Sequence, residues 1–407
     1  MFFAYNLLTI IAGFILRIIA LFNPKIKLFI DGRKEVFKTL EEKIKPGDTT
    51  IWFHSASLGE YEQGLPIMEK IRLQYPSHKI VLTFFSPSGY EIRKNTKAAD
   101  VTVYLPLDTK ANAKKFMTLV KPEMVFFVKY EYWPNYLAEL KKSNTPTYLI
   151  SGLFRKKQVF FKWYGGFYRK ALKTFTRFFV QDNNSKELLL SIGLNNITVS
   201  GDTRFDRVSE ILQRDNSLPF IEEFKNHKTT LVIGSSWPKD EEMLIDFINS
   251  SNSTKFIIAP HNIKPDQIEE LRNSITKKTV LFSEKEGKSL AEYDVFIIDT
   301  IGILGKIYSY ADIAYVGGGF GTSGLHNILE PAAFGVPIVI GPNHEKFPEA
   351  VAMTHMGGCI AVNNKGEMNE TLSSLVYNDD YRLEKGHIAG TFVSMNRGAV
   401  NIIMNNL

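Results

Sequence analysis

The chain has 407 residues and a mass of 46.3 kDa, more than one ordinary hydrophobic core accommodates, and this length predicts two domains. Hydrophobic residues make up 44% and charged residues 23% of the sequence, a globular composition that excludes disordered and fibrous architectures. The 49 Lys and Arg outnumber the 43 Asp and Glu by six, and this basic balance favours an anionic partner. The single cysteine, Cys359, excludes an intramolecular disulfide and a CxxC metal site and is typical of a reducing compartment.

Segment 1–22 predicts a membrane anchor. It carries one charge, Arg17, and a helix of this length, rising about 1.5 Å per residue, just spans the hydrocarbon core. The flank that follows it is basic and contains Lys25, Lys27, Arg33 and Lys34. By the positive-inside rule, such a flank places the rest of the chain in the cytoplasm. The alternative is an amphipathic helix that packs on the protein or lies in the membrane interface.

The remaining chain alternates between short apolar runs and helix-like segments. The expected strands are 50–54, 79–84, 124–128, 147–150, 178–181, 230–233, 255–259, 295–298, 313–316 and 337–340. Repeated strand-then-helix units predict an α/β protein with parallel sheets covered by helices on both faces. Segment 204–224 lacks an apolar run and is the expected linker. The sequence therefore predicts two Rossmann-like domains that face a cleft, with boundaries at 1–22 (anchor), 23–210 and 211–407.

Two loops after expected strands of the N-terminal domain carry candidate catalytic groups, because ligands of open α/β sheets bind at the carboxyl ends of the strands. The first, Ser-Ala-Ser-Leu-Gly-Glu, ends at Glu60, whose alternative role is to complement the dipole of the helix that begins there. The second follows strand 124–128 and begins Lys129-Tyr-Glu131-Tyr-Trp. Its aromatic residues suit a sugar, although a core aromatic pair with a surface ion pair would give the same pattern.

A glycine-rich segment, 317–331, follows an expected strand of the C-terminal domain. Glycines that lead into a helix expose backbone N–H groups and a positive helix end to a phosphate, and they include Gly318 and Gly319. Gly319, Gly321 and Gly324 also match the dinucleotide fingerprint GxGxxG. A nicotinamide-dependent oxidoreductase would need an acidic residue after the next strand, where this chain has Gly-Pro-Asn.

Three further turns lie at the same sheet edge as the glycine-rich segment. They are Gly234-Ser235-Ser236, the Ala-Pro-His-Asn turn with Pro260 and His261, and the Asp-Thr-Ile-Gly turn that ends at Gly302. Each alone is an ordinary turn, but together with the glycine-rich segment they predict a nucleotide pocket.

Segment 155–177 holds eight basic residues, no acidic residue and many aromatic residues. Such interleaving also serves single-stranded nucleic acid, or forms a helix with a solvated basic face. Beside a membrane anchor, we expect an anionic, phosphorylated lipid as the partner and no nucleic acid. The residues expected on this acceptor or membrane surface are Lys156, Lys157, Arg169 and Lys170.

Six motifs together resemble the 3-deoxy-D-manno-octulosonic acid (Kdo) transferases of Gram-negative bacteria. They occur in the order and at about the spacing of that family, from the N-terminal anchor to about residue 348: SASLGE, KYEYWPN, GDTRFD, GSSW, the DTIG turn and GLHNILEP. The resemblance implies a membrane-associated GT-B glycosyltransferase that transfers Kdo from CMP-Kdo to the lipid A precursor in lipopolysaccharide biosynthesis. It further implies an inverting reaction at the cytoplasmic side of the inner membrane, without a cofactor or a metal.

The resemblance also implies roles for particular residues. Glu60 becomes the general base, and Glu330 binds the ribose hydroxyls. The nucleotide contacts map to Pro260, His261, Ile301, Gly302, Ile303, Asn327, Ile328, Leu329 and Glu330, and to the neighbouring Gly234, Ser235, Gly318, Gly319 and His326.

Three departures from the family pattern concern charged positions. Lys129 stands where the family often has Glu, whereas Glu131 matches its second acidic position. His261 stands where Arg is common, and Arg204 replaces a Lys in the GDTRFD turn. Lys129, Glu131 and Arg204 are therefore candidate catalytic residues beside Glu60.

Two other function classes are compatible with this sequence. Another membrane-associated GT-B glycosyltransferase that uses a different nucleotide sugar would share the architecture. A non-catalytic two-domain binding protein would share it too, but it would not need an accessible carboxylate at Glu60.

Overall fold

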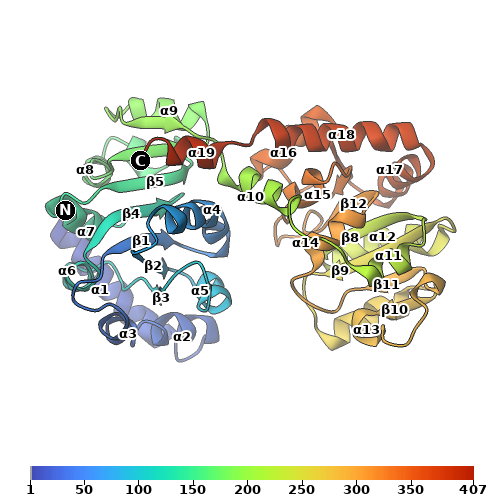
Figure 1. Ribbon diagram of the computed structural model, residues 1–407, viewed down its shortest axis with the longest axis horizontal. Helices are drawn as coiled ribbons and strands as arrows, with labels where there is room; N and C mark the ends of the chain where they lie inside the picture. Colours follow the sequence, from blue (N-terminus) through green and yellow to red (C-terminus); the bar gives the residue numbers. More distant parts are fainter. Residues whose placement is uncertain (1) are drawn as a thin grey trace. The chain divides into compact units, whose positions relative to one another are not determined.

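The computed structural model describes residues 2–407, which divide into two compact units (Figure 1). Unit 1 extends to Arg207 and also includes Arg397–Leu407, whereas unit 2 is Val208–Asn396. The expected boundary at residue 210 therefore lies close to the observed one. The expectation that 211–407 forms one domain is wrong at its end, because the C-terminal segment packs with unit 1.

Unit 1 is built on a sheet of seven strands, all parallel, in the order β3-β2-β1-β4-β5-β6-β7. The strands are β1 (Thr50–Ser55), β2 (Lys79–Phe84), β3 (Val101–Tyr104), β4 (Pro122–Val128), β5 (Thr147–Gly152), β6 (Arg177–Val180) and β7 (Ile197–Val199).

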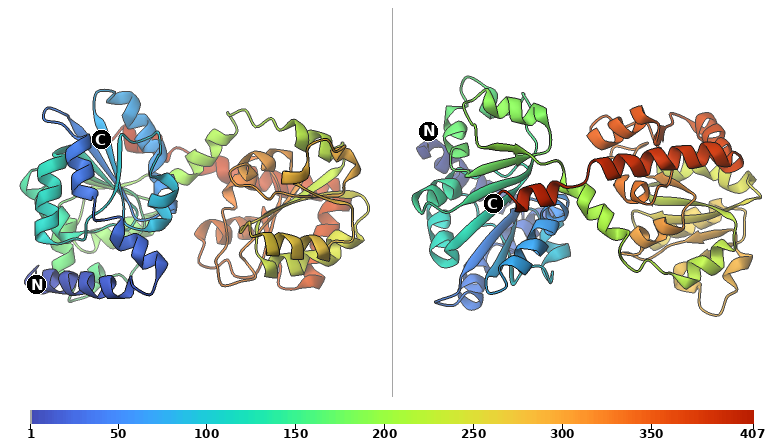
Figure 2. Two further views of the ribbon diagram at one scale, coloured as in Figure 1. Left: turned by 90° about the horizontal axis from the view of Figure 1, so that it is seen from below. Right: turned by 45° about the horizontal axis from the view of Figure 1, so that its top comes forward.

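Helices cover both faces of this sheet, as the two views of Figure 2 show. They are α1 (Phe2–Ile19), α2 (Pro24–Asp31), α3 (Val36–Lys43), α4 (Leu58–Gln74), α5 (Pro87–Arg93), α6 (Lys110–Val120), α7 (Pro134–Lys142), the 3-10 turn η1 (Val159–Phe161), α8 (Gly166–Leu172), α9 (Asn183–Leu190), α10 (Thr203–Ile211), which continues into unit 2, and α19 (Ala399–Met404).

The apolar runs of unit 1 become strands because both faces of a parallel sheet are covered. In β1, Trp52 belongs to the hydrophobic cluster on one face, and Ile51 and Phe53 belong to the cluster on the other. All six β1 residues are buried. This two-sided burial explains why the strand reads as a continuous apolar run and not as an alternating one.

Unit 2 repeats the design with a second parallel sheet of seven strands, in the order β10-β11-β9-β8-β12-β13-β14. Its strands are β8 (Thr229–Ser236), β9 (Thr254–Pro260), β10 (Thr279–Leu281), β11 (Val295–Ile297), β12 (Ile313–Val316), β13 (Ile338–Ile340) and β14 (Cys359–Ala361). Its helices are α11 (Pro219–Lys225), α12 (Pro238–Ser250), α13 (Pro265–Ser274), η2 (Phe282–Glu284), η3 (Leu290–Glu292), α14 (Leu304–Ile307), η4 (Tyr308–Tyr310), α15 (Leu329–Ala333), α16 (Pro348–Met356), α17 (Lys365–Tyr377) and α18 (Asp379–Met395).

All ten expected strands are present, which confirms the α/β prediction with two parallel sheets. The four strands that the sequence did not predict, β3, β7, β10 and β14, are the edge strands of the two sheets. Each is three or four residues long, too short to give a clear apolar run. The expected linker 204–224 contains most of α10 and most of α11, and no strand crosses it.

Helix α1 lies on unit 1 by one side and leaves most of its apolar surface exposed. Tyr5 Oη donates a hydrogen bond to Asp108 Oδ2 at 2.7 Å, and the rings of Phe2 and Phe167 are 4.8 Å apart. Gly13 is the one buried residue of the helix, and a side chain there would meet Leu107. Within residues 2–407, α1 alone is long and apolar enough to cross a membrane.

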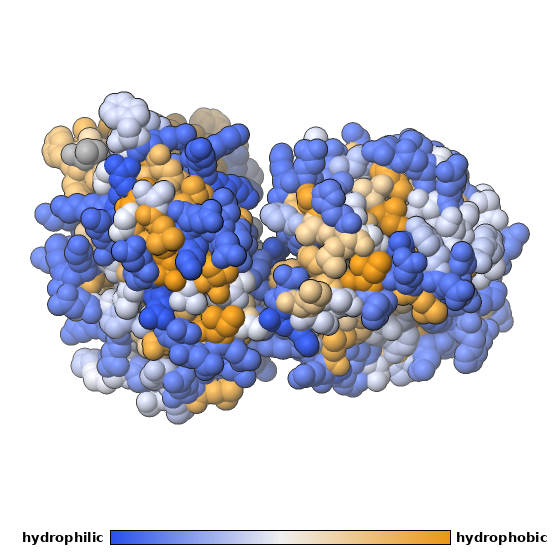
Figure 3. Space-filling model, turned by 90° about the horizontal axis from the view of Figure 1, so that it is seen from above, coloured by the Kyte–Doolittle hydropathy of each residue, from blue (hydrophilic) through white to orange (hydrophobic). Residues whose placement is uncertain are grey.

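The exposed apolar residues of α1 contrast with the surface elsewhere. On the face drawn in Figure 3, most of the surface of each unit is hydrophilic and apolar residues form only small patches. In α1, by contrast, Phe3 is 81% exposed, and the large exposed side chains also include Leu8, Ile10 and Phe14. A surface of this kind marks a site of contact with lipid or protein.

Arg33 from the expected basic flank has a structural role. Its guanidinium donates hydrogen bonds to the backbone oxygens of Phe29, Phe85 and Leu105 and lies 3.6 Å from the centre of the Phe29 ring. Burial lowers the pKa of Arg33 to about 9. Arg33 therefore ties α2 to the sheet and is not a free surface charge.

The second aspartate of the GDTRFD motif holds the C-terminal helix on unit 1. Asp206 accepts hydrogen bonds from the backbone N–H groups of Gly398 and Val400, at 2.9 Å and 3.3 Å. Val400 and Ile403 of α19 pack into one hydrophobic cluster of unit 1. Figure 1 draws α19 in red among the blue and green elements of that unit. Burial raises the pKa of Asp206, which the backbone donors oppose.

Candidate functional site

Each unit gathers its candidate residues at the carboxyl edge of its own sheet, where the loops after parallel strands emerge. In unit 1 these loops follow β1 and β4, which are neighbours in the sheet. In unit 2 they follow β8, β9, β11 and β12.

Glu60 lies in the first turn of α4, directly after β1. Ser57 precedes the helix, and its Oγ donates a hydrogen bond to Glu60 Oε2. Glu60 is half-buried and Gly59 beside it is exposed, so the carboxylate remains accessible. The small-residue loop thus orients the carboxylate without enclosing it, as a general base requires.

Basic side chains surround the Tyr130 ring beside Glu60. Lys129 has a left-handed backbone, with φ of 66°, so the chain turns sharply where β4 ends. Lys129 Nζ lies 5.1 Å from the centre of the Tyr130 ring, and the Arg155 guanidinium lies 6.0 Å from it. Burial raises the pKa of Tyr130. The positive charges of Arg155 and Arg204 oppose this rise, and the negative charge of Glu60 adds to it. The charges of Lys129, Arg155, Arg204 and Glu60 therefore lie around Tyr130 at one part of the sheet edge.

Arg204 is fixed by an ion pair with Asp202. Arg204 Nη2 lies 2.7 Å from Asp202 Oδ2, and Gln63 Nε2 of α4 donates to Asp202 Oδ1 at 3.0 Å. Burial opposes ionisation of Asp202, but the Arg204 guanidinium outweighs it and lowers the pKa of that carboxyl. The pair links the GDTRFD turn to the helix that carries Glu60.

Glu131 is held through one oxygen. Its Oε2 accepts hydrogen bonds from His54 Nε2 at 2.9 Å and from Trp133 Nε1 at 2.8 Å. The carboxylate is 11% exposed. The segment therefore presents Glu131 at the sheet edge on a rigid support, and its aromatic residues are part of that support.

The glycine-rich segment of unit 2 packs against two strand ends, and this close approach explains its glycines. A Cβ on Gly317 would lie 2.3 Å from the Ser235 carbonyl oxygen, and one on Gly319 would lie 2.6 Å from the backbone of Gly341. Gly318 has φ of 96°, which L-residues rarely adopt. Ser235 itself has φ of 53°, so both loops turn sharply where they meet.

A buried carboxylate, Asp240, joins these loops. Its Oδ2 accepts hydrogen bonds from the backbone N–H groups of Trp237 at 2.9 Å and Gly318 at 2.8 Å, and its Oδ1 accepts one from Tyr315 Oη at 2.7 Å. The sequence did not predict this role. The signal available was an acidic residue three positions after Trp237, at the start of an apolar helix, which is the second half of a capping box.

An irregular segment lies between the glycines and helix α15. Helix α15 starts at Leu329 and has five residues. The glycine-rich segment therefore runs into a helix beside Glu330, as expected. The backbone N–H groups of Gly318 and Phe320 are already engaged, because both donate to Asp240.

Three aromatic rings stack at the ends of β8, β9 and the glycine-rich segment. The Trp237 and His261 rings are 4.5 Å apart and nearly parallel, and the His261 and His326 rings are 4.4 Å apart. Trp237 Nε1 donates to His326 Nε2 at 3.1 Å, which requires that nitrogen to be unprotonated. The pKa of His326 is lowered to about 4, mainly by burial and also by the neighbouring His261, while Asp240 opposes this shift.

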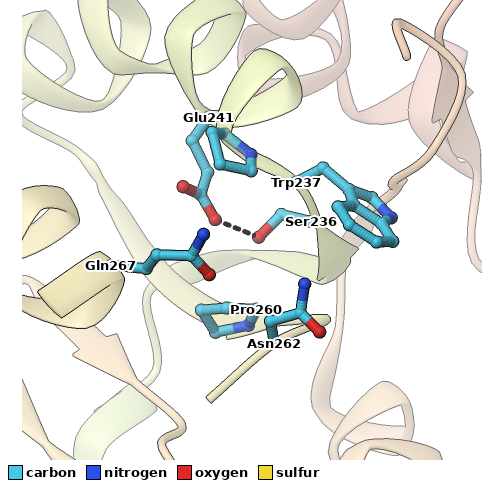
Figure 4. Close-up of a pocket in the computed structure, with 7 residues that line it drawn as sticks. Ser236, Trp237, Glu241, Pro260, Asn262 and Gln267 are labelled. Atoms are coloured by element: carbon cyan, nitrogen blue, oxygen red, sulfur yellow. Dashed lines mark hydrogen bonds between the residues drawn. The ribbon is translucent and has the colours of Figure 1, made fainter. Parts of the chain in front are cut away.

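A small pocket lies beside the stack, between the ends of β8 and β9 and the starts of α12 and α13 (Figure 4). Pro260 and Asn262 form one side, Trp237 another, and Gln267 points into it. Ser236 Oγ donates to Glu241 Oε1 at 2.7 Å. Burial raises the pKa of Glu241, which this hydrogen bond opposes.

The turn after β11 is exposed and close to the same edge. Ile301 is 88% exposed, Gly302 has φ of 95°, and Ile303 precedes α14. A Cβ on Gly234 would meet Leu304 of α14 at 3.2 Å, so the turn adjoins the end of β8.

Asn327, Ile328, Leu329 and Glu330 form the last part of the predicted site. Asn327 Nδ2 donates to Glu330 Oε1 at 3.1 Å, and Asn327 Oδ1 accepts from the Leu329 N–H at 3.1 Å. Ile328 and Leu329 are buried and anchor the turn, while Asn327 is exposed and Glu330 is half-buried. Within residues 2–407, no group of three His, Cys, Asp or Glu side chains could hold a metal ion.

The basic segment 155–177 borders α1 through Phe167, whose ring lies 4.8 Å from Phe2. Lys156, Lys157 and Lys170 are exposed, and Trp163 is 91% exposed. Arg169 differs, because its guanidinium donates to the carbonyls of Phe160 and Lys162. A surface cavity nearby is lined by Lys141, Gly166, Arg169, Lys170, Lys173 and Ile192.

Comparison with known proteins agrees with this architecture. A family model described as 3-deoxy-D-manno-octulosonic-acid transferase (kdotransferase) matches residues 31–207. A 3-deoxy-D-manno-octulosonic acid transferase of Chlamydia muridarum is 30% identical over 330 residues, 77% of this chain and 75% of that protein. One of Chlamydia trachomatis serovar D is 29% identical over 377 residues, 88% and 86% of the two chains. A glycosyltransferase structure from Rickettsia africae aligns with a TM-score of 0.56, at 13% identity, over 88% of this chain and 97% of the other.

The two parallel sheets and these similarities define a glycosyltransferase of the GT-B fold. More specifically, the chain belongs to the 3-deoxy-D-manno-octulosonic acid (Kdo) transferase family and is a Kdo transferase. The expectations of a nicotinamide-dependent oxidoreductase and of a non-catalytic binding protein are thereby excluded.

The pKa of His326 predicts that acid destabilises unit 2. Between pH 6.5 and about 4, the unfolded histidine takes up a proton that the native one does not, so stability is lost as the pH falls through this range. We expect the melting temperature of His326→Gln to fall about 3 °C less than that of the wild type between pH 7 and pH 5. Calorimetry with His387→Gln, an exposed histidine of α18, as the control checks this, and identical pH dependence in all three proteins contradicts it.

Proposed function

We propose that this Kdo transferase moves Kdo from CMP-Kdo to the lipid A precursor, with inversion, at the cytoplasmic side of the inner membrane. The observation that carries the proposal is the accessible carboxylate of Glu60, on the SASLGE loop at the carboxyl edge of the unit 1 sheet. Unit 1 would bind the acceptor and unit 2 the nucleotide of the donor.

The chemistry needs one general base. The acceptor hydroxyl oxygen attacks the anomeric carbon of Kdo, the bond from that carbon to the phosphate oxygen breaks, and CMP leaves with the electron pair. Glu60 takes the hydroxyl proton. A single direct displacement inverts the anomeric configuration, so no covalent sugar–enzyme intermediate is required. The hydrogen bond from Ser57 orients Glu60 for this role.

Three features of unit 2 support the nucleotide assignment. The glycines of the glycine-rich segment let a phosphate approach the backbone closely at the sheet edge. Pro260 and His261 line the edge of β9, and His261 is exposed. Glu330, held by Asn327, is suited to accept hydrogen bonds from the two ribose hydroxyls.

The acceptor and membrane assignments rest on α1 and the basic segment. The exposed apolar residues of α1 would contact lipid, and the adjoining lysines would bind phosphate groups of the acceptor or of anionic lipids. Because the glycolipid acceptor is itself a membrane component, a transferase with both features beside one another reaches it directly.

Replacement of Glu60 tests the base. Glu60→Gln keeps an acceptor for Ser57 but cannot take a proton, so we expect turnover to fall by roughly 10² to 10⁴-fold with little change in CMP affinity. Transfer of labelled Kdo from CMP-Kdo measures this, with Glu187→Gln, an exposed position of α9 in the same unit, as the matched control. Turnover within a few-fold of the wild type would remove Glu60 from the mechanism.

Replacement of Glu330 tests the nucleotide site. Glu330→Ala removes a charged acceptor, and we expect CMP to bind about 10-fold more weakly, while Glu60→Gln binds CMP normally. Calorimetric titration with CMP and with UDP measures this and also separates a CMP-specific site from one for a UDP-sugar. Glu370→Ala, an exposed residue of α17, serves as the control, and a thermal melt excludes unfolding. Unchanged CMP affinity in Glu330→Ala would contradict the assignment.

Neutralisation of the basic surface tests acceptor binding. We choose the exposed Lys156, Lys157, Lys170 and Lys173, all changed to Gln, and leave Arg169 intact because it supports the loop. Each basic residue near an anionic surface contributes about 1 kcal/mol, so the KM for a phosphorylated acceptor in mixed micelles should rise at least 10-fold at low salt. High salt should remove most of the difference.

The matched control for the basic surface changes four exposed lysines elsewhere to Gln: Lys70, Lys97, Lys186 and Lys228. It alters the net charge by the same amount. An equal rise of KM in both quadruple variants would mean that only net charge matters and that the acceptor is bound elsewhere on unit 1.

A further inference from the structure

His54, at the end of β1, is a fully buried histidine with a hydrogen-bond partner at each ring nitrogen. Its Nδ1 lies 2.8 Å from Thr83 Oγ1 of β2, and its Nε2 lies 2.9 Å from Glu131 Oε2. The imidazole therefore connects two neighbouring strands to the loop that follows β4. The proposed role of Glu60 as general base does not require this hydrogen-bonded connection through His54.

The contacts of His54 show which ring nitrogen donates to Glu131. An unprotonated Nε2 would place two acceptors 2.9 Å apart at Glu131, so Nε2 carries a proton and donates it. Nδ1 lies 2.8 Å from Thr83 Oγ1 and 3.2 Å from the Thr83 carbonyl oxygen. Thr83 Oγ1 accepts a hydrogen bond from Trp52 Nε1 at 2.8 Å and donates one to the Phe53 carbonyl at 3.3 Å. The ring is therefore held at both nitrogens, with Nε2 as the donor to Glu131.

Glu131 receives a second donor on the same oxygen. Trp133 Nε1 donates to Oε2 at 2.8 Å and lies 3.0 Å from His54 Nε2, so the three groups form a tight triangle. Within residues 2–407, no hydrogen bond or ion pair to the other oxygen, Oε1, is formed. The protein thus immobilises the carboxylate through Oε2 and leaves Oε1 for another partner.

We propose that His54 is a positioning residue for the transfer reaction: it fixes Glu131 through Oε2 so that Oε1 faces the reacting sugar beside the Glu60 loop. This rests on the proposed function. The sugar develops positive charge at its anomeric carbon as the bond to CMP breaks, and a fixed carboxylate stabilises that charge without having to reorganise. Glu131 touches the substrate, and His54 acts only through Glu131.

Two variants of His54 separate positioning from packing. The amide nitrogen of Gln reaches the place of Nε2, whereas that of Asn reaches only the place of Nδ1. We expect His54→Asn to lower kcat about 30 to 100-fold, with the KM values for donor and acceptor within three-fold of the wild type. His54→Gln, which restores a donor to Glu131, should stay within about five-fold of the wild-type kcat.

A double-variant cycle shows whether His54 acts through Glu131. In the Glu131→Gln background, adding His54→Asn should lower kcat by less than two-fold, because the carboxylate it positions is already absent. Thermal melts of all variants monitor folding. The proposal is overturned if His54→Asn keeps normal kcat, if Asn and Gln at position 54 lower it equally, or if the Asn effect persists in full in the Glu131→Gln background.

A spectroscopic readout is independent of activity. Nitrogen-15 NMR of labelled histidine in the full-length wild type should show that Nε2 of His54 carries a proton, with the signal assigned by its loss in His54→Gln. An unprotonated Nε2 would overturn the positioning contact. If the wild type did not use CMP-Kdo, the proposed function would fail on that result alone, and the proton on Nε2 would still decide whether His54 holds Glu131.

Discussion

Every strand of both sheets is parallel to its neighbours, and the rest of the structure depends on that constraint. Parallel strands need crossover helices that cover both faces, so the strands are mostly apolar on both sides and most polar residues lie in the loops. Each strand-to-helix loop leaves its sheet at the carboxyl edge. Glu60 and Glu131 therefore meet at one edge of unit 1, and Ser235, His261 and His326 meet at one edge of unit 2, although long stretches of sequence separate them.

Buried polar side chains then fix the loops that carry the chemistry. Asp240 binds the N–H groups of two loops of unit 2, and Asp108 binds those of Asn135 and Tyr136 at the start of α7 in unit 1. His54 holds Glu131 in the same way. A buried donor or acceptor without a partner costs free energy. Loop conformations that would break these hydrogen bonds are therefore disfavoured. The accessible carboxylates of Glu60 and Glu330 are each oriented by a nearby side chain, that of Ser57 and that of Asn327.

The packing of α1 places an exposed apolar surface beside a basic segment on unit 1. Contacts of Tyr5 with Asp108 and of Phe2 with Phe167 dock this helix beside the basic segment 155–177. An apolar surface of the kind that suits lipid tails and cations of the kind that suit phosphate groups then lie next to each other. Arg169 is a charged residue of this segment with a structural role. It donates hydrogen bonds to two carbonyls of the loop that carries Trp163.

The sequence by itself determined the α/β class, the ten inner strands and the loops that hold the candidate site, because burial on both faces imposes long apolar runs that end abruptly in polar residues. It did not determine the four edge strands, since a strand of three or four residues that pairs on one side needs no such run. The return of α19 to unit 1 and the roles of Asp240, Asp202 and His54 were decided only by the tertiary structure. Each depends on a partner distant in sequence, such as Gly398 for Asp206 or Glu131 for His54, and only folding brings such partners within hydrogen-bond distance.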